Sequence, residues 1–256
     1  MVKQSRQGLQ SLVPVTAVPV LLTRPLAQAT RFADQLIARF GPRVTPIISP
    51  LMRTTYVDAT FPDVACSAVI FTSEAGVAAA QRFQIAGKTL PLKAFCVGAQ
   101  TAKAAAMLGF DARSADGDAV ALIALIRDDL PTAPLLHLHG RNTRGNVAET
   151  LTLAGLKTFS VVVYDQTSQP LSGAAIAALT ASNPVVIPLF SPRSAALLAA
   201  SVSLPCRSPL LIAAMSRAVA DAAAPLLPTA LHIATTPDAE GMLAATEVLL
   251  TLAGAP

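Results

Sequence analysis

The sequence predicts an α/β protein built from two similar parallel-sheet, flavodoxin-like lobes that are joined by a two-stranded β linker. Three observations predict this fold class. Short apolar runs alternate with longer Ala- and Leu-rich helical patterns, which is typical of βαβ units and parallel sheets. Three short motifs occur twice in the same order. Two β-rich segments, each with one tyrosine, stand at matching places in the two halves of the chain.

The composition limits the class of protein. The chain has 256 residues and a net charge of +4, with 53% hydrophobic and 13% charged residues. Domains usually run to about 100–150 residues, so this length suggests two of them. The hydrophobicity and low charge density exclude a disordered chain, and 20 Pro and 13 Gly exclude a coiled coil. Every apolar run is interrupted before the ~18–20 residues that a membrane span needs, so no membrane partner is expected.

Strands are expected where short runs of Val, Ile, Leu, Ala and Phe stand between breaking residues. In chain order they are Pro19–Thr23, Val44–Ile48, Ala68–Phe71, Ala94–Val97, a shorter one near Phe110–Arg113, Leu135–Leu138, Phe159–Tyr164, Val185–Phe190, Leu210–Ala213 and Leu231–Ala234. Helices are expected where Ala and Leu recur at helical spacing over longer stretches. These are Leu26–Phe40, Glu74–Phe83, Gln100–Leu108, Ala119–Asp128, Thr143–Leu153, Ala174–Leu179, Pro192–Ala200, Arg217–Ala224 and Ala239–Leu252.

An internal repeat indicates two copies of one module. Three motifs are echoed, in one order: Val20–Pro25 by Leu135–Gly140, Val69–Ser73 by Ile187–Ser191, and Phe95–Ala102 by Leu211–Ala218. The offsets are 115 residues from Ala33 to Ala148, 118 from Ser73 to Ser191, and 116 from Ala102 to Ala218. A period this long is a whole domain and excludes a solenoid.

The repeat and the two tyrosine-bearing segments predict the domain organisation. Residues 1–50 together with 167–256 are expected to form one discontinuous lobe, and residues 55–162 the other. The linker segments are 50–57 and 161–169, which hold the only two tyrosines, Tyr56 and Tyr164. The competing topology is two consecutive lobes that divide near residue 128.

Several motifs stand where predicted strands run into predicted helices. In open parallel sheets, ligands bind beyond the carboxyl ends of the strands, where helix starts expose unpaired N–H groups. Thr72-Ser73 and Ser191-Pro192 have this form, and so do Gly98 with Thr101 and their echo Ser216. Two interpretations stay open for them: ordinary helix capping, and binding of a substrate carboxylate by the same groups.

Other chemistry-bearing patterns are weak. Gly140–Gly145 superficially suggests a phosphate loop, but it lacks the Walker lysine and the three-glycine fingerprint, which leaves a nucleotide-using transferase a distant third hypothesis. His137 and His139 alternate on one strand without the further ligands a metal needs. Aromatic residues are 4% with no Trp, so no stacking platform for nucleic acid is expected.

The N-terminus and the cysteines bear on location. Lys3 and Arg6 before Leu12–Leu22 imitate a signal peptide, but Pro14 and Pro19 interrupt the run, so residues 1–16 are expected to be an irregular extension. The cysteines Cys66, Cys96 and Cys206 are odd in number and lack metal spacing. They are expected to be buried reduced thiols in a reducing compartment, which predicts a cytoplasmic location.

An ordered set of short motifs resembles uroporphyrinogen-III synthase from about residue 18 to the C-terminus. The motifs are Leu22–Pro25, Val69–Ser73, Val97-Gly98 with Thr101-Ala102, Gly140, Val163-Tyr164 before Thr167, and Phe190–Pro192. The resemblance implies two α/β lobes, the first of them discontinuous. It also implies a monomeric hydro-lyase of tetrapyrrole (haem) biosynthesis that needs no metal or organic cofactor. Its substrate would be hydroxymethylbilane, a linear tetrapyrrole with eight carboxylates, and its product uroporphyrinogen III, in which ring D is inverted.

The resemblance also implies roles for particular residues. Tyr164 aligns with the family tyrosine that assists departure of the ring A hydroxyl, the alternative being a packing role in the linker. Carboxylate-binding candidates, some of them added for their place near strand ends, are Arg24, Thr72, Ser73, Gly98, Thr101, Gly140, Arg141, Ser191, Arg193 and Ser216. The segment Ala213–Met215 departs from the Gly-containing turn of many relatives. This departure weakens the support for Ser216 as a carboxylate-binding residue. The runner-up function is a two-lobed small-molecule binding protein of the periplasmic type.

Overall fold

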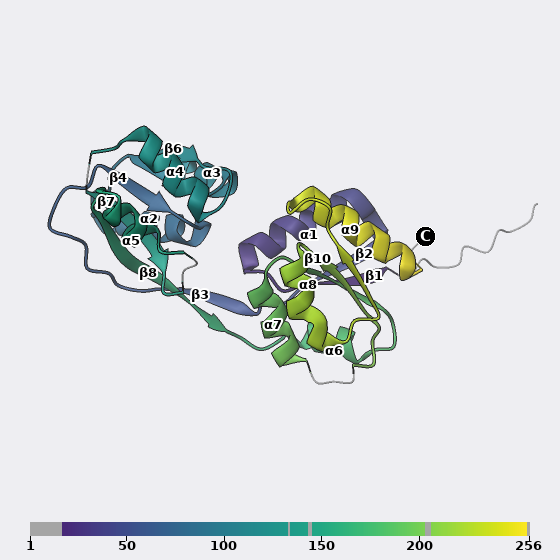
Figure 1. Ribbon diagram of the computed structural model, residues 1–256. Coiled ribbons are helices and arrows are strands. Elements are labelled where there is room, and N and C mark those ends of the chain that lie inside the picture. Colours follow the sequence, from purple (N-terminus) through teal and green to yellow (C-terminus); the bar gives the residue numbers. More distant parts are fainter. Residues whose placement is uncertain (1–16, 133, 143–144, 203–205, 255–256) are drawn as a thin grey trace, which may run out of the picture. The chain divides into compact units, whose positions relative to one another are not determined.

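The computed structural model describes residues 17–132, 134–142, 145–202 and 206–254 (Figure 1). They divide into two compact units: unit 1 holds residues 17–52 and 168–254, and unit 2 holds Arg53–Thr167. The predicted extension, residues 1–16, lies outside the described residues. Within the described part of the chain, no helix combines the length and the apolar character that crossing a membrane requires.

Unit 1 is a five-stranded parallel sheet with helices on both faces. Its elements are β1 (Val18–Leu22), α1 (Leu26–Phe40), β2 (Val44–Ile48), α6 (Gly173–Thr180), β9 (Val185–Leu189), α7 (Pro192–Ser201), β10 (Leu210–Ala214), α8 (Arg217–Ala223), β11 (Ala230–Ile233) and α9 (Ala239–Leu252). The strands lie in the order β11-β10-β9-β1-β2, and all four neighbouring pairs are parallel. Numbered along the chain, this is the order 2-1-3-4-5 of flavodoxin-like sheets.

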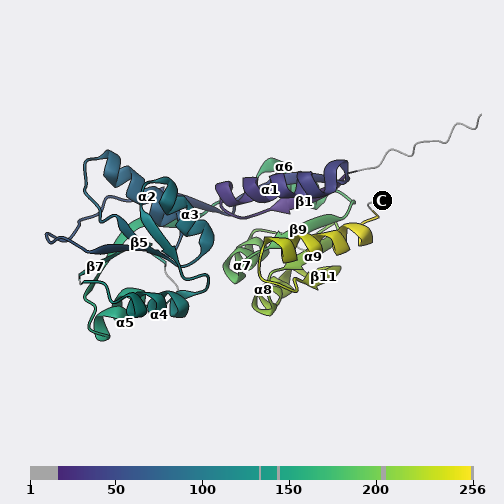
Figure 2. The ribbon, with the colours of Figure 1, turned by 90° about the horizontal axis from the view of Figure 1, so that it is seen from above.

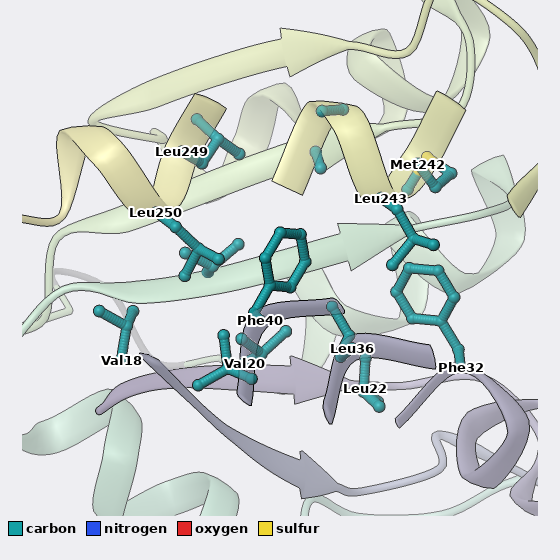
Figure 3. Packing of buried hydrophobic residues seen from close by; sticks show 14 of the residues in the cluster. Val18, Val20, Leu22, Phe32, Leu36, Phe40, Met242, Leu243, Leu249 and Leu250 are labelled. Carbon is teal, nitrogen blue, oxygen red and sulfur yellow. The ribbon is translucent and has the colours of Figure 1, made fainter. Parts of the chain in front are cut away.

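Alternating side chains of β1 build the two cores of unit 1, because successive residues of a strand point to opposite faces. Val20 and Leu22 pack with side chains of α1 and α9 in one cluster. Figure 3 shows this cluster, with Phe32 of α1 and Leu243 of α9 among its members. Leu21 belongs to a second cluster, which α6, α7 and α8 complete on the other face.

Unit 2 repeats this architecture in a different chain order. Its elements are β3 (Met52–Tyr56), β4 (Ala68–Phe71), α2 (Glu74–Ile85), β5 (Lys93–Cys96), α3 (Ala99–Met107), β6 (Asp111–Ser114), α4 (Ala119–Asp129), β7 (Leu135–Gly140), α5 (Val147–Leu153) and β8 (Thr158–Ser168). The sheet order is β3-β8-β7-β4-β5-β6. Helices α2 and α3 cover one face, and α4 and α5 cover the other (Figure 2).

Five strands of each sheet correspond once the chain order is permuted, and β3 adds a sixth strand at the edge of the unit 2 sheet. β7 and β8 take the places of β1 and β2, while β4, β5 and β6 take those of β9, β10 and β11. The three echoed motifs therefore lie at equivalent strand ends, and the predicted fold class is confirmed. The motifs that follow β1, β4 and β5 are echoed after β7, β9 and β10, which are the equivalent strands of the other sheet. Each echoed pair therefore occupies one position of the shared sheet order.

Most element boundaries lie within one or two residues of the prediction, with two instructive differences. The predicted strand Phe159–Tyr164 and the predicted linker 161–169 form one continuous strand, β8. Helix α5 begins at Val147, because Gly145 has the left-handed φ of 79° and cannot continue a helix. The predicted start of that helix, Thr143, lies outside the described residues.

The segments predicted as linkers run antiparallel to each other. The Val57 N–H donates to the Val163 carbonyl, and the Gln169 N–H donates to the Leu51 carbonyl. Residue numbers therefore increase along one segment as they decrease along the other. These two segments are where the chain passes from one unit to the other.

All three cysteines are free thiols, but only Cys96 is buried as expected. Cys66 and Cys206 are half-buried because they lie in loops before β4 and β10.

Candidate functional site

The candidate site in unit 2 lies where the strand order reverses. Successive connections run outward in opposite directions from the neighbours β7 and β4, which makes a switch point. Gly140 ends β7, and Thr72-Ser73 follows β4, so both motifs lie at the carboxyl edge beside this point. In unit 1 the equivalent neighbours are β1 and β9, and Thr23-Arg24 and Ser191 follow them. Each unit therefore presents its motifs at the position that ligands occupy in such sheets.

A β-bulge aims Tyr164 at this edge. The pairing of β7 with β8 runs from His139 with Val162 directly to Gly140 with Tyr164, which leaves Val163 as the extra residue. In a regular strand Val163 and Tyr164 would face opposite sides, whereas here both pack in one buried cluster with side chains of α2. Bulges commonly redirect a side chain beside a functional site. Tyr164 is only 8% exposed, compared with 39% for Tyr56.

The Tyr164 hydroxyl lies 2.8 Å from Ser73 Oγ, a distance typical of an O–H···O hydrogen bond. Ser73 is the N-cap of α2, and its Oγ accepts a hydrogen bond from the Gly76 N–H at 3.2 Å. The sequence therefore correctly suggested a cap at Ser73. It did not suggest that the same hydroxyl would contact the tyrosine, which is 91 residues away along the chain.

Gly140 makes room for the Tyr164 ring. A Cβ at this position would lie 2.4 Å from Tyr164 Cε2 and 2.9 Å from its hydroxyl oxygen. Real Cβ atoms do not approach other atoms so closely, so the ring can occupy its place only beside glycine. The backbone fixes the tyrosine further, because the Arg141 N–H donates to the Tyr164 carbonyl. Gly140 therefore makes room for Tyr164, whereas the resemblance placed it among the carboxylate-binding candidates.

The Arg141 side chain already has an acidic neighbour. Its Nε donates to Asp165 Oδ2 at 3.0 Å, and the guanidinium stays mostly exposed. Exposed ion pairs of this kind contribute little to stability. Asp165 was not among the candidate site residues predicted from the sequence. Its position directly after Tyr164 was the feature that could have indicated it.

The two histidines of β7 lie on the sheet face opposite to Tyr164. They contribute to a cavity of about 200 Å³ together with Glu149 and Ser160. His139 donates from Nδ1 to the Gly140 carbonyl, and its Nε2 lies 2.6 Å from Ser160 Oγ. His137 Nε2 lies 3.4 Å from Thr72 Oγ1. The described residues contain no group of three or more His, Cys, Asp or Glu side chains arranged to hold a metal ion.

The burial of His137 predicts a pH-dependent stability. Burial, with a smaller contribution from His139, lowers the pKa of His137 from 6.5 to about 3. The unfolded chain takes up this proton near pH 6.5 and the folded one only near pH 3. The folded state therefore keeps its full stability with respect to His137 above pH 6.5. Below pH 6.5 the free energy of unfolding decreases by up to about 1.4 kcal/mol per pH unit.

Urea unfolding of the wild type and of His137→Gln, between about pH 7 and about pH 4, measures this contribution. The variant side chain is neutral at every pH, so the wild type should lose stability relative to the variant as the pH falls. Parallel stability curves for the two proteins would contradict the assignment to His137. Glu149, which lines the same cavity, is retained in both proteins and cancels in the difference.

The helix starts differ in their capacity to bind an anion. In unit 2, α2 already carries the Ser73 cap and Glu74 in its first turn. Helix α3 has Gly98 as N-cap, no side-chain cap and no acidic residue in its first turn, and open space lies beside Gly98. The predicted helix Gln100–Leu108 is α3, which begins at Ala99, so Thr101 lies in its first turn. The Thr101 side chain is buried, so its backbone N–H is the group that can bind a ligand.

The equivalent positions of unit 1 show the same contrast. Ser191 caps α7, where its Oγ accepts from the Ser194 N–H, and Arg193 lies within the first turn. Helix α1 has no side-chain cap and no acidic residue in its first turn, and Arg24 stands before it with its guanidinium 3.9 Å from the centre of the Phe190 ring. Ser216 is the N-cap of α8 but makes no capping hydrogen bond.

A larger cavity lies at the opposite edge of the unit 2 sheet. It measures about 370 Å³, and its lining includes Phe61, Cys66, Lys88 and Leu90, which precede the amino ends of β4 and β5. Because ligands of open α/β sheets bind beyond the carboxyl ends, the candidate site stays with Tyr164 and the start of α3.

The fold and these strand ends define a class: a two-unit α/β protein with helix starts open to anionic groups and a fixed tyrosine in its second unit. Within that class, the chain belongs to the uroporphyrinogen-III synthase family, since the family described as uroporphyrinogen-III synthase HemD matches residues 32–244. Membership implies a tetrapyrrole substrate and confirms the resemblance drawn from the motifs.

A solved structure of the same description supports the fold. Uroporphyrinogen-III synthetase from Helicobacter pylori 26695 matches with a TM-score of 0.63 and 16% identity, over 92% of this chain and 99% of that one. Uroporphyrinogen III synthase from the extremely thermophilic bacterium Thermus thermophilus matches with a TM-score of 0.39 and 18% identity, over 92% and 97% of the two chains. At these identities the first likeness shows the fold alone, and the second carries no argument. A comparison with curated proteins gave no match.

Proposed function

We propose that this protein cyclises hydroxymethylbilane to uroporphyrinogen III, as a hydro-lyase that works without metal or nucleotide. Family membership over residues 32–244 is the observation that carries the proposal. It favours the synthase over the two-lobed binding protein that the sequence also allowed. We extend the proposal to the lobes: unit 1 and unit 2 serve as the discontinuous and the continuous lobe of the synthase, each presenting strand-end groups to the substrate.

Tyr164 is the group proposed to assist the first step. The pyrrole nitrogen of ring A supplies the electron pair that breaks the bond between the hydroxymethyl carbon and its oxygen. The phenol donates its proton toward that oxygen, which leaves as water. Ring D then attacks the azafulvene through its substituted α-carbon and gives a spiro intermediate. That intermediate fragments and recloses at the other α-carbon, and the proton lost there can restore the phenol.

The carboxylates of the substrate are proposed to bind at helix starts. The first turn of α3, with Gly98 and the Thr101 N–H, is the most open start in unit 2, because neither a cap nor an acidic residue occupies it. The start of α1 has the same character in unit 1, and Arg24 adds positive potential there. Unpaired N–H groups and the helix dipole favour anions at both places.

The other candidates are proposed as supporting contacts. Thr72, Arg141 and the backbone of Gly140 line the strand ends of unit 2 beside Tyr164, and Ser191, Arg193 and Ser216 line those of unit 1. Binding many carboxylates at fixed points would hold the two ends of the tetrapyrrole in a near-attack arrangement. Positioning of this kind is worth several kcal/mol of the barrier.

Incubation with enzymatically generated hydroxymethylbilane tests the proposal. The product is oxidised and the uroporphyrin isomers are separated, with one arm containing a strong chelator after exhaustive dialysis. We expect isomer III in both arms, because the proposed chemistry uses only groups of the protein and of the substrate. Isomer III that disappears on chelation and returns with an added ion would contradict the cofactor-free mechanism.

A further inference from the structure

We propose that Ser73 is a positioning residue for Tyr164: its hydroxyl donates a hydrogen bond to the phenol oxygen and so leaves the phenol proton for the substrate. The inference rests on the proposed function, in which Tyr164 is the proton donor. It changes the role of Ser73 from a carboxylate ligand, as the motif suggested, to a partner of the tyrosine.

The hydrogen-bond inventory at Ser73 favours this direction. A hydroxyl has one proton to donate and two lone pairs to accept. The Gly76 N–H occupies one lone pair of Ser73 Oγ, and the phenol oxygen lies 2.8 Å from the same atom. A hydroxyl that accepts from an N–H becomes a better donor, because hydrogen bonds in a chain polarise one another. The chain then runs from Gly76 through Ser73 to the oxygen of Tyr164.

This chain also places the phenol oxygen at the positive end of a helix. Helix α2 has 12 residues and begins at Glu74, directly after Ser73. Its N-terminal N–H groups favour negative charge nearby. As the phenol gives up its proton to the leaving oxygen, the negative charge that develops is met by the Ser73 hydroxyl and, through it, by the helix start. Ser73 keeps its own proton throughout the step.

The repeat supplies an internal comparison. Ser191 is the echo of Ser73, and its Oγ accepts from the Ser194 N–H as Ser73 accepts from that of Gly76. In unit 1 the Ser191 hydroxyl also donates to Ser194 Oγ at 2.9 Å, so its proton is used within the first turn of α7. In unit 2 the corresponding residue is Gly76, which has no side chain to take that proton. The proton of Ser73 is therefore available for Tyr164.

Glycine and threonine at position 73 separate this role from capping. Glycine is nearly as good an N-cap as serine, so Ser73→Gly removes the hydroxyl with little loss of stability. We expect a kcat about 3- to 10-fold lower at an unchanged KM, which corresponds to one neutral hydrogen bond that matters in the transition state. Ser73→Thr keeps a hydroxyl and should restore most of the rate. In the Tyr164→Phe background, Ser73→Gly should have no further effect, because the oxygen it serves is gone.

Ser172→Gly is the matched control. Ser172 caps α6 in unit 1, and its Oγ accepts from the Ala175 N–H at 3.2 Å, the same contact and distance as at Ser73. The control should keep the wild-type kcat. A raised KM at constant kcat for Ser73→Gly, or an equal fall in kcat with and without the Tyr164 hydroxyl, would overturn the proposal and leave Ser73 as a direct ligand or a cap.

A spectroscopic readout is independent of activity. The chain has only two tyrosines and no Trp, so the variant Tyr56→Phe leaves Tyr164 as the single phenol. The intensity ratio of the tyrosine Fermi doublet in the Raman spectrum distinguishes a phenol that accepts a hydrogen bond from one that donates strongly. We expect the acceptor type, and a change on Ser73→Gly. A strong-donor ratio, or no change, would overturn the proposal, whereas a wild type that forms no isomer III would refute the proposed function alone.

Discussion

Replacing Gly140 by alanine is expected to lower the rate of isomer III formation by about 10- to 100-fold while the protein remains folded. The added Cβ would lie 2.4 Å from Cε2 and 2.6 Å from Cζ of Tyr164. The buried ring must therefore move, which breaks the 2.8 Å contact of its hydroxyl with Ser73. A catalytic group displaced by about 1 Å can lose a factor of 100 in rate, and overpacking costs about 1–3 kcal/mol of stability.

The measurement is kcat for isomer III, taken with circular dichroism and a melting curve. Gly173→Ala is the control: Gly173 begins α6, has no left-handed φ, and has no atom within 4 Å of the added Cβ. This control should keep full activity. A Gly140→Ala protein that is folded and turns over at the wild-type rate would show that the position of the Tyr164 ring does not matter for catalysis.

Tyr164→Phe is expected to lower kcat about 5- to 150-fold and to leave substrate affinity largely unchanged. One hydrogen bond made mainly in the transition state is worth roughly 1–3 kcal/mol. The loss should not be complete, because the pyrrole nitrogen supplies the electron pair and the carboxylate contacts remain. Phenylalanine keeps the ring that packs in the buried cluster of unit 2, so the fold should survive.

Tyr56→Phe is the internal comparison for this variant. Tyr56 also lies in one of the predicted linker segments, but it is 39% exposed and its ring lies beneath the Arg82 guanidinium, 5.0 Å from the ring centre. Its replacement should leave isomer III formation unchanged. Equal rates for the wild type and Tyr164→Phe would reject the catalytic role, and so would equal losses for both tyrosines that track their melting temperatures.

The sequence was sufficient for the architecture because the signals that define it are local and repeated. Strand periods and strand-end motifs recur at similar offsets, and the structure places them at equivalent positions in two sheets that share the order of five strands. The boundaries that moved did so for conformational reasons that periodicity does not encode. Helix α5 begins later than predicted because Gly145 has a left-handed φ. Strand β8 continues through a segment that was predicted as a strand followed by a linker.

The candidate site was less predictable because its contacts depend on register. Alternation along β8 would place Tyr164 on the face opposite to Val163, and only the bulge brings both to the face that carries Ser73. The tyrosine itself came from the family resemblance. Its pairing with Ser73 and its packing over Gly140 join strand ends far apart in the sequence. Helix capping was easier to predict, because Ser73 and Ser191 cap the helices that follow them directly.

The isomer composition of the product tests the central claim most directly. Hydroxymethylbilane closes without catalysis to the isomer in which ring D is not inverted, so isomer III reports the action of the protein alone. With increasing protein at fixed substrate, the fraction of isomer III should rise toward completeness, and Tyr164→Phe should need more protein to reach the same fraction. A product that stays isomer I at every concentration of folded wild-type protein would contradict the account.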